Sequence, residues 1–181
     1  GASRTALEIT VPYSEKSFSE YIGHQPEQTV SVEASRSLAP AAYDRALRLR
    51  SDVRPIVGVA CTATIATDRT KRGDHRGHVG LWTSEGWSVF SLTLEKGLRD
   101  RAGEEQLLSV LILKTLASAC DVPDAANAVA IGFAGFRVAD PEVERLAVLG
   151  PLPGAILALD GCQTRHLCTV LRKVRRPVDR A

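Results

Sequence analysis

Apolar and polar residues alternate along several short stretches of the chain, and this period of two is typical of strands with one buried face. Leu7, Ile9 and Val11 alternate with polar residues before Pro12. Further single strands are predicted at 56–61 and 128–133. Two hairpins are also predicted: one pairs 79–83 with 87–94 around 84–86, and the other pairs 155–159 with 167–171. The sequence therefore contains enough strands to build a sheet.

Segments with apolar residues at helical spacing separate these strands. Helices are predicted at about 15–21, 31–50 and 100–119, with a shorter one at 141–149. Ser14 and Ser31 stand where N-caps are expected, and Pro40 should either kink the second helix or delay its start. The third helix carries leucines on most sides, which predicts that it is the most buried. This order of elements predicts an α/β fold, with a mixed β-sheet and helices on both faces.

Composition and charge narrow the class of protein. The chain has 181 residues, of which 44% are hydrophobic and 24% are charged, and this fits one globular domain. No apolar run reaches the roughly 18 to 20 residues that span a bilayer, and the net charge of +2 is too small to indicate nucleic-acid binding. The four cysteines lack the spacing of a metal site, so no metal or cofactor is predicted and a cytoplasmic location is expected. Because the chain contains no methionine, we expect it to be a piece of a longer protein.

The most distinctive stretch is the polar segment 62–78, which follows a predicted strand. In α/β proteins such segments commonly carry ligand-binding groups. Lys71, Arg72 and Arg76 are candidates for binding a phosphate or a carboxylate, and Thr62 and Thr64 could add hydroxyl and main-chain donors. A solvated charged loop without a ligand explains the same pattern equally well.

Neighbouring side chains extend this candidate site. His75 could act as a proton donor, because histidine exchanges protons near neutral pH, and Asp74 could orient it or pair with an arginine. His75 and His78 lie three residues apart, but no third metal ligand is evident. Arg99 stands just before the third predicted helix, where it could bind an anion or pair with a glutamate of that helix.

Several short motifs, taken in order, resemble the C-terminal domain of the CinA family (competence/damage-inducible protein A), whose members include nicotinamide-nucleotide amidases. They are Val-Pro-Tyr-Ser at 11–14, Val-Ser-Val-Glu at 30–33, the strand and loop at 57–66, Lys-Arg-Gly-Asp-His-Arg at 71–76 and Leu-Glu-Lys-Gly-Leu-Arg at 94–99. The last two are closest to a divergent branch in which such a domain precedes a nucleotidylyltransferase-like domain. The resemblance covers residues 1–122, and residues 123–181 are expected to form an extension packed on the same domain.

The resemblance implies a three-layer α/β/α domain that lacks the family's first strand and helix, since the family's Glu-Ser-Cys-Thr-Gly-Gly motif lies upstream of Gly1. It also implies that Tyr13 and Ser14 line the cleft, although a strand end and a helix cap explain them too. Lys16 lies near the place of the family's catalytic lysine, but the register is shifted and Phe18 stands at the expected position. A nucleophile and a base at the family's positions are therefore missing from this chain.

Three functions remain as hypotheses. In the first, a catalytically degenerate relative of the amidases binds a phosphorylated, nucleotide-type ligand through the basic residues and Arg99. In the second, an upstream segment supplies a serine, and the domain is an active nicotinamide-nucleotide amidase with catalytic roles for His75 and Lys16. In the third, the domain mediates structure or oligomerisation for an attached nucleotidylyltransferase-type domain. The expected partners are thus a small nucleotide and a second copy of the chain, with no membrane and no nucleic acid.

Overall fold

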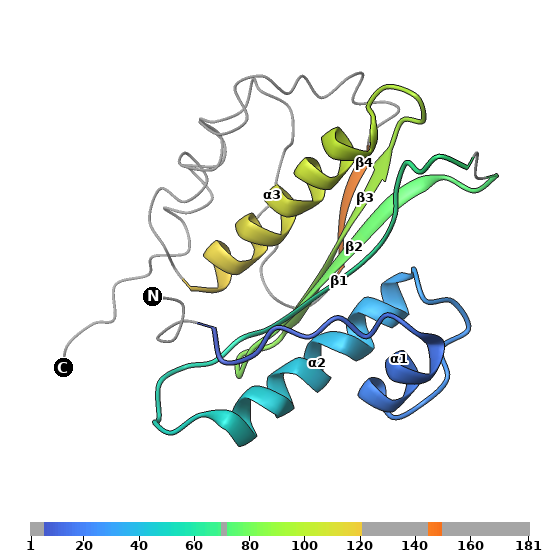
Figure 1. Cartoon of the computed structure of the whole chain (residues 1–181). Helices are drawn as coiled ribbons and strands as arrows, with labels where there is room; N and C mark the ends of the chain where they lie inside the picture. The colour runs from blue at the N-terminus through green and yellow to red at the C-terminus, as the bar shows by residue number, and fades with distance from the viewer. Residues whose placement is uncertain (1–5, 70–71, 121–144, 150–181) are drawn as a thin grey trace, which may run out of the picture.

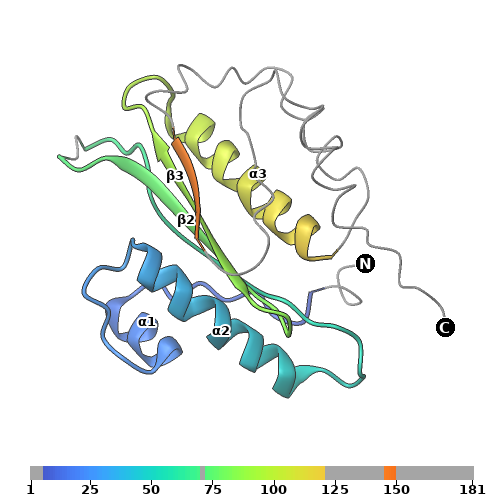
Figure 2. The same cartoon turned by 180° about the vertical axis from the view of Figure 1, so that it is seen from behind.

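The computed structural model describes residues 6–69, 72–120 and 145–149. Within these ranges the elements are, in chain order, α1 (Glu15–Ile22), α2 (Val32–Leu49), β1 (Gly58–Thr64), β2 (His75–Trp82), β3 (Trp87–Leu94), α3 (Arg101–Ala119) and β4 (Arg145–Leu149). Figure 1 shows α2 and α3 on opposite sides of the strands, and Figure 2 shows the same arrangement from behind. The expected combination of a sheet with helices is present.

The four strands form one sheet in the order β1-β2-β3-β4. The strand β2 pairs with both of its neighbours, so that His78 lies opposite Thr62 on one side and opposite Ser91 on the other. On the far side of β3, β4 extends the sheet, with Val148 opposite Phe90. Every strand pair in the described ranges is antiparallel, so the parallel pairing that a mixed sheet requires is not found there.

The hairpin of β2 and β3 forms as predicted, but the strands around the polar segment are longer than expected. The strand β1 continues to Thr64, and β2 begins at His75 instead of residue 79. The reason is strand pairing: Thr64 lies opposite Arg76, and the register continues without interruption to Gly58 opposite Trp82. The predicted loop at 62–78 is therefore shortened to residues 65–74, and four of its seven candidate residues lie on strands, namely Thr62, Thr64, His75 and Arg76.

Two other predictions of secondary structure are wrong. Residues 7–11 do not form a strand, and Ile9 and Val11 remain 86% and 77% exposed, because no neighbouring strand pairs with them. Residues 145–149, expected within a short helix, form β4, because the outer edge of β3 offers main-chain partners to them. The predicted strands at 128–133, 155–159 and 167–171 lie outside the described residues.

Each of the three described helices begins after a polar N-cap residue. The side chains of Ser14, Ser31 and Asp100 accept main-chain hydrogen bonds from Ser17, Ala34 and Gly103 at 3.1, 3.0 and 2.8 Å. The cap at Ser31 starts α2 ahead of Pro40, which lies inside a continuous helix, so a later start is wrong. The helix α3 buries Leu107, Leu108, Val110 and Leu111, but its opposite side leaves Leu113 52% exposed, so it is not buried all round.

Glycines let both helices approach the sheet. A Cβ on Gly80 would collide with the main chain of Ser35 on α2, and a Cβ on Gly77 would collide with Leu108 on α3. Because successive strand residues point to opposite faces, even-numbered residues of β2 face α2 and odd-numbered residues face α3. This alternation decides which candidate residues can share a site.

Two apolar clusters stabilise the fold. The larger one packs Leu107, Leu108 and Leu111 of α3 onto Val79, Phe90 and Leu92 of the sheet. The smaller one packs Phe18 of α1 against Ala34 and Leu38 of α2. Within the described part of the chain, none of the helices has the length and apolar character needed to cross a membrane.

Candidate functional site

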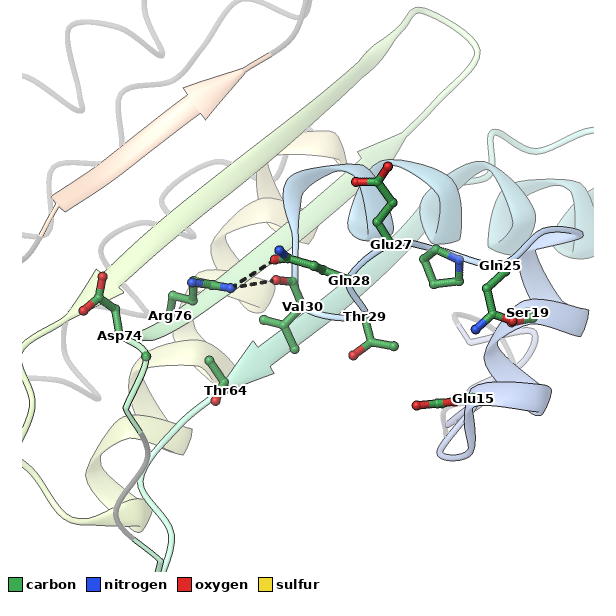
Figure 3. A pocket seen from close by; sticks show the side chains of 12 residues that line it. Glu15, Ser19, Gln25, Glu27, Gln28, Thr29, Val30, Thr64, Asp74 and Arg76 are labelled. Carbon is green, nitrogen blue, oxygen red and sulfur yellow. Dashed lines mark hydrogen bonds between the residues drawn. The ribbon is translucent and has the colours of Figure 1, made fainter.

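A cavity of about 520 Å³ opens where α1, the connection from α1 to α2, the end of β1 and the start of β2 meet (Figure 3). Its lining consists of Glu15 and Ser19 from α1, residues 25–30 from the connection, Thr64 from β1, and Gly73, Asp74 and Arg76 from the turn into β2. The volume lies within the range of about 300–1,000 Å³ that is typical of small-molecule pockets.

Arg76 is the cation of this cavity. Its Nη2 atom donates to Oε1 of Gln28 at 3.4 Å and to the carbonyl oxygen of Val30 at 3.3 Å, as the dashed lines of Figure 3 show. Both bonds are long and leave from one nitrogen, whereas a guanidinium carries five N–H donors in a planar fork. Arg76 is therefore held at the wall of the cavity with donors remaining for a ligand.

Three carboxylates share the cavity wall with this guanidinium. Glu15, Glu27 and Asp74 all line the cavity, and all three are exposed. None of the ion pairs within 4.0 Å in the described part of the chain joins Arg76 to one of them. The described part of the cavity wall thus presents one positive and three negative groups at separate places.

His75 lies on the other face of the sheet, although it precedes Arg76 directly. Its Nδ1 atom is 2.7 Å from Oε1 of Glu104, and both side chains are buried, that of Glu104 completely. The second oxygen of Glu104 accepts the main-chain N–H of Ala66 at 2.7 Å. The partner that orients His75 is therefore Glu104, and not Asp74 as the sequence had indicated.

Thr62 and His78 belong to a buried polar network beneath α2. The hydroxyl of Ser35 lies 3.0 Å from that of Thr62 and donates to the carbonyl oxygen of His78 at 2.9 Å. The imidazole of His78 in turn lies 2.9 Å from the hydroxyl of Ser91. Burial lowers the pKa of His78, and the charge of Arg76 adds to this effect. Thr62 has a structural partner and does not reach the cavity.

The remaining predicted residues lie elsewhere. Tyr13 is 96% exposed, Ser14 caps α1, and Lys16 on α1 is an exposed partner of Glu20 at 4.0 Å. Arg72 is exposed and accepts a hydrogen bond from Lys96 through its carbonyl oxygen at 3.1 Å.

Arg99 packs beside Gly103 at the start of α3, away from the cavity lining. Lys71 lies outside the described residues. The structure therefore brings together Thr64, Asp74 and Arg76, but not the full set of basic residues.

Sequence reasoning missed the α1–α2 connection as part of the site. Glu27, Gln28 and Thr29 contribute side chains to the cavity wall, and Val30 contributes a carbonyl group that bonds Arg76. The available signal was the polar run at 27–29, shortly before the N-cap Ser31, because loops that lead into a helix commonly carry binding groups.

No metal centre is formed by the residues at 6–69, 72–120 and 145–149, where no three His, Cys, Asp or Glu side chains gather. Comparison of the chain with known protein families, with characterised proteins and with solved structures found no match. The function must therefore be argued from the geometry and charge of the cavity.

Proposed function

We propose that the cavity binds a small phosphorylated ligand that also carries a positive charge, of the kind represented by nicotinamide mononucleotide. The observation that carries this proposal is the distribution of charge around the cavity: the guanidinium of Arg76 on one part of the wall, and the carboxylates of Glu15, Glu27 and Asp74 on others. A mononucleotide with a cationic ring is complementary to both kinds of group.

Arg76 is the group suited to the phosphate. The planar fork of a guanidinium matches phosphate oxygens with two parallel hydrogen bonds. Its two bonds to the α1–α2 connection leave from Nη2 alone and hold the side chain in place. Thr64 lies opposite Arg76 on the neighbouring strand and lines the cavity beside it.

The carboxylates select the rest of the ligand. A nucleoside di- or triphosphate would bring several negative charges to a wall whose described residues already carry three negative charges and one positive charge, which weakens binding. A pyridinium ring, in contrast, is attracted by nearby carboxylates. A monophosphate with a cationic base is therefore favoured over polyphosphates.

Binding, and not hydrolysis, is the activity that the lining supports. The part of the cavity wall that the structure describes carries hydroxyl groups but no lysine, histidine or cysteine beside them. A serine nucleophile needs an adjacent base, and the hydroxyl of Ser19 donates to Gln25 at 3.4 Å and not to one of the cavity's carboxylates. We accordingly propose a three-layer, CinA-like domain that retains ligand binding without the amidase reaction.

Isothermal titration with nicotinamide mononucleotide tests the proposal. We expect saturable heat with the native chain, and Arg76→Gln should weaken binding at least about tenfold, as the loss of a charge-assisted contact predicts. Arg72→Gln is the matched control, since Arg72 lies close in sequence but is exposed and outside the lining. An absence of heat at millimolar ligand, or equal affinities for the native chain and Arg76→Gln, would contradict the proposal.

Two ligand analogues separate the charged groups. Nicotinamide riboside retains the cationic ring but lacks the phosphate, and adenosine monophosphate retains the phosphate but lacks the cation. Both should bind more weakly than nicotinamide mononucleotide. An ammonia assay on the same mixtures addresses the amidase alternative, because release of ammonia would show hydrolysis of the carboxamide.

A further inference from the structure

The side chain of Glu104 connects α3 with His75 of β2 and with Ala66, which follows β1. It is completely buried near the start of α3, yet both of its oxygens accept hydrogen bonds. Oε1 lies 2.7 Å from Nδ1 of His75, and Oε2 accepts the main-chain N–H of Ala66 at 2.7 Å. These distances lie at the short end of the range for N–H···O hydrogen bonds, and they fit Nδ1 of the imidazole as a donor to the carboxyl group.

The two groups that Glu104 holds stand next to the cavity lining. Ala66 follows Thr64 by two residues, and His75 lies between Asp74 and Arg76. Since successive residues of a strand point to opposite faces, His75 faces α3 while Arg76 faces the cavity. Glu104 therefore holds from behind the two chain segments that carry Thr64, Asp74 and Arg76.

Strand pairing supplies only part of this restraint, since His75 pairs with Leu94 of β3 but not with the segment that follows β1. The register of β1 and β2 ends with the pair Thr64 and Arg76, and beyond it the two segments separate into the connection at 65–74. The further hydrogen bond that reaches Ala66 from α3 is a long one, 3.5 Å from Nη1 of Arg101 to the carbonyl oxygen, at an exposed position. Beside the burial of Ile65 in the core and the pairing of His75 with Leu94, Glu104 is thus the side chain that joins the two segments directly past the last pair.

We propose that Glu104 is a positioning residue of the cavity: by holding Ala66 and His75 together it fixes where Arg76 and Asp74 meet the ligand, from the opposite face of the sheet. The identity of the ligand rests on the function proposed above. The restraint itself does not, because it acts on the chain in the absence of any ligand.

Amide hydrogen exchange of the ligand-free protein, followed residue by residue with NMR, tests the restraint. In Glu104→Gln one acceptor oxygen becomes a donor, so the hydrogen bonds to Ala66 and His75 can no longer both persist with the same proton positions. Exchange at Ala66, His75 and Arg76 should accelerate at least about tenfold, whereas Val89 and Phe90 in β3 should keep their native rates. Unchanged rates at the first three amides would overturn the proposal.

Two further variants keep this measurement decisive. His75→Asn places an amide donor where Nδ1 stood and should preserve most of the protection, whereas His75→Leu removes the donor and should reproduce the effect of Glu104→Gln. Leu111→Ala, two turns further along α3 and fully buried, is the control for general destabilisation. It should raise exchange throughout the core without singling out the two segments beside the cavity, and selective acceleration there would count against a special role for Glu104.

A binding cycle with nicotinamide mononucleotide then separates positioning from stability. Glu104→Gln should weaken binding about tenfold, Leu111→Ala should leave the affinity unchanged, and the double variant Glu104→Gln/Arg76→Gln should bind no more weakly than Arg76→Gln alone. Additive losses would overturn the proposal, because Glu104 would then not act through Arg76. If the native chain does not bind this probe, the proposed function fails, and the exchange rates still decide the role of Glu104.

Discussion

The hydroxyl of Ser35 on α2 donates a hydrogen bond of 2.9 Å to the main-chain carbonyl of His78 on β2, although the two residues are 43 positions apart in the chain. Ser35 is completely buried, and its hydroxyl also lies 3.0 Å from that of Thr62 on β1. One buried side chain thus links α2 to β1 and β2, the two strands whose ends line the cavity.

Replacing Ser35 by alanine should therefore destabilise the protein. The change leaves the buried hydroxyl of Thr62 without its partner and removes a donor from the carbonyl of His78, which should lower the free energy of unfolding by about 1–3 kcal/mol. Urea denaturation followed by circular dichroism measures this difference. Ser37→Ala on the same helix is the control, with an expected change below about 0.5 kcal/mol. Equal effects at both positions would show that the network contributes little.

Gly80 should tolerate no side chain. A Cβ at this position meets the main chain of Ser35, which cannot move without displacing α2. Gly80→Ala should therefore cost about 1–3 kcal/mol or more in the free energy of unfolding. Gly73→Ala is matched to it, because a Cβ there has no heavy atom within 4 Å, and it should be close to neutral. Thermal unfolding of the two variants compares them directly.

The stability of the protein should depend on pH through His78. Burial and the charge of Arg76 lower the pKa of its imidazole in the folded state, with Glu33 acting in the opposite direction. The unfolded chain binds the proton at about pH 6.5, so just below this pH it holds more protons than the folded chain. The contribution of His78 to the free energy of unfolding should then be fully present above about pH 6.5 and should be lost as the pH falls below it.

Urea denaturation of the native chain and of His78→Asn between about pH 5 and pH 7.5 measures this dependence. The variant should show a shallower decrease at low pH, since one titrating group has been removed. His24→Asn, at an exposed position, is the matched substitution. Identical slopes for the native chain and His78→Asn would contradict the assignment.

The carboxylates of the cavity should select for the charge of the ligand. Glu27→Gln should weaken binding of nicotinamide mononucleotide by about two- to fivefold, as expected for an exposed charge pair. It should have little effect on the reduced form of the same nucleotide, whose ring is neutral. Glu20→Gln on α1, outside the cavity lining, is the control. Equal losses for both forms of the ligand would show that Glu27 does not sense the ring.

Local sequence patterns predicted the helices well, because a helix and its N-cap are specified by residues close together in the chain. Ser14 and Ser31 cap the helices that the sequence assigned to them. The strands were harder to delimit. The sequence predicts Thr62, Thr64 and His78 within a loop, because a run of polar residues normally indicates one. They lie in strands because partners distant in the chain, Ser35 and Ser91 among them, satisfy their side chains or those of their neighbours.

The candidate site was predicted in part for the same reason. Thr64, Asp74 and Arg76 lie near one another in sequence and in the fold, whereas the connection at 25–30 reaches the cavity only through tertiary packing. The sequence offers Glu104 or Glu105 as a partner for Arg99, because both stand near the start of a predicted helix with charged neighbours. Its complete burial follows from the position of α3 on the sheet, and a single sequence carries no information about that position.

The side-by-side placement of His75 and Arg76 on opposite faces has a consequence for how the chain can vary in length. Inserting one residue between them would place both side chains on the same face of the sheet, so that either the imidazole would leave Glu104 or the guanidinium would leave the cavity wall. Residues 67–69, 72 and 73, in contrast, are exposed, and extra residues beside them would leave both side chains in place. Natural or engineered length changes should therefore be accepted in that stretch and rejected immediately beyond it.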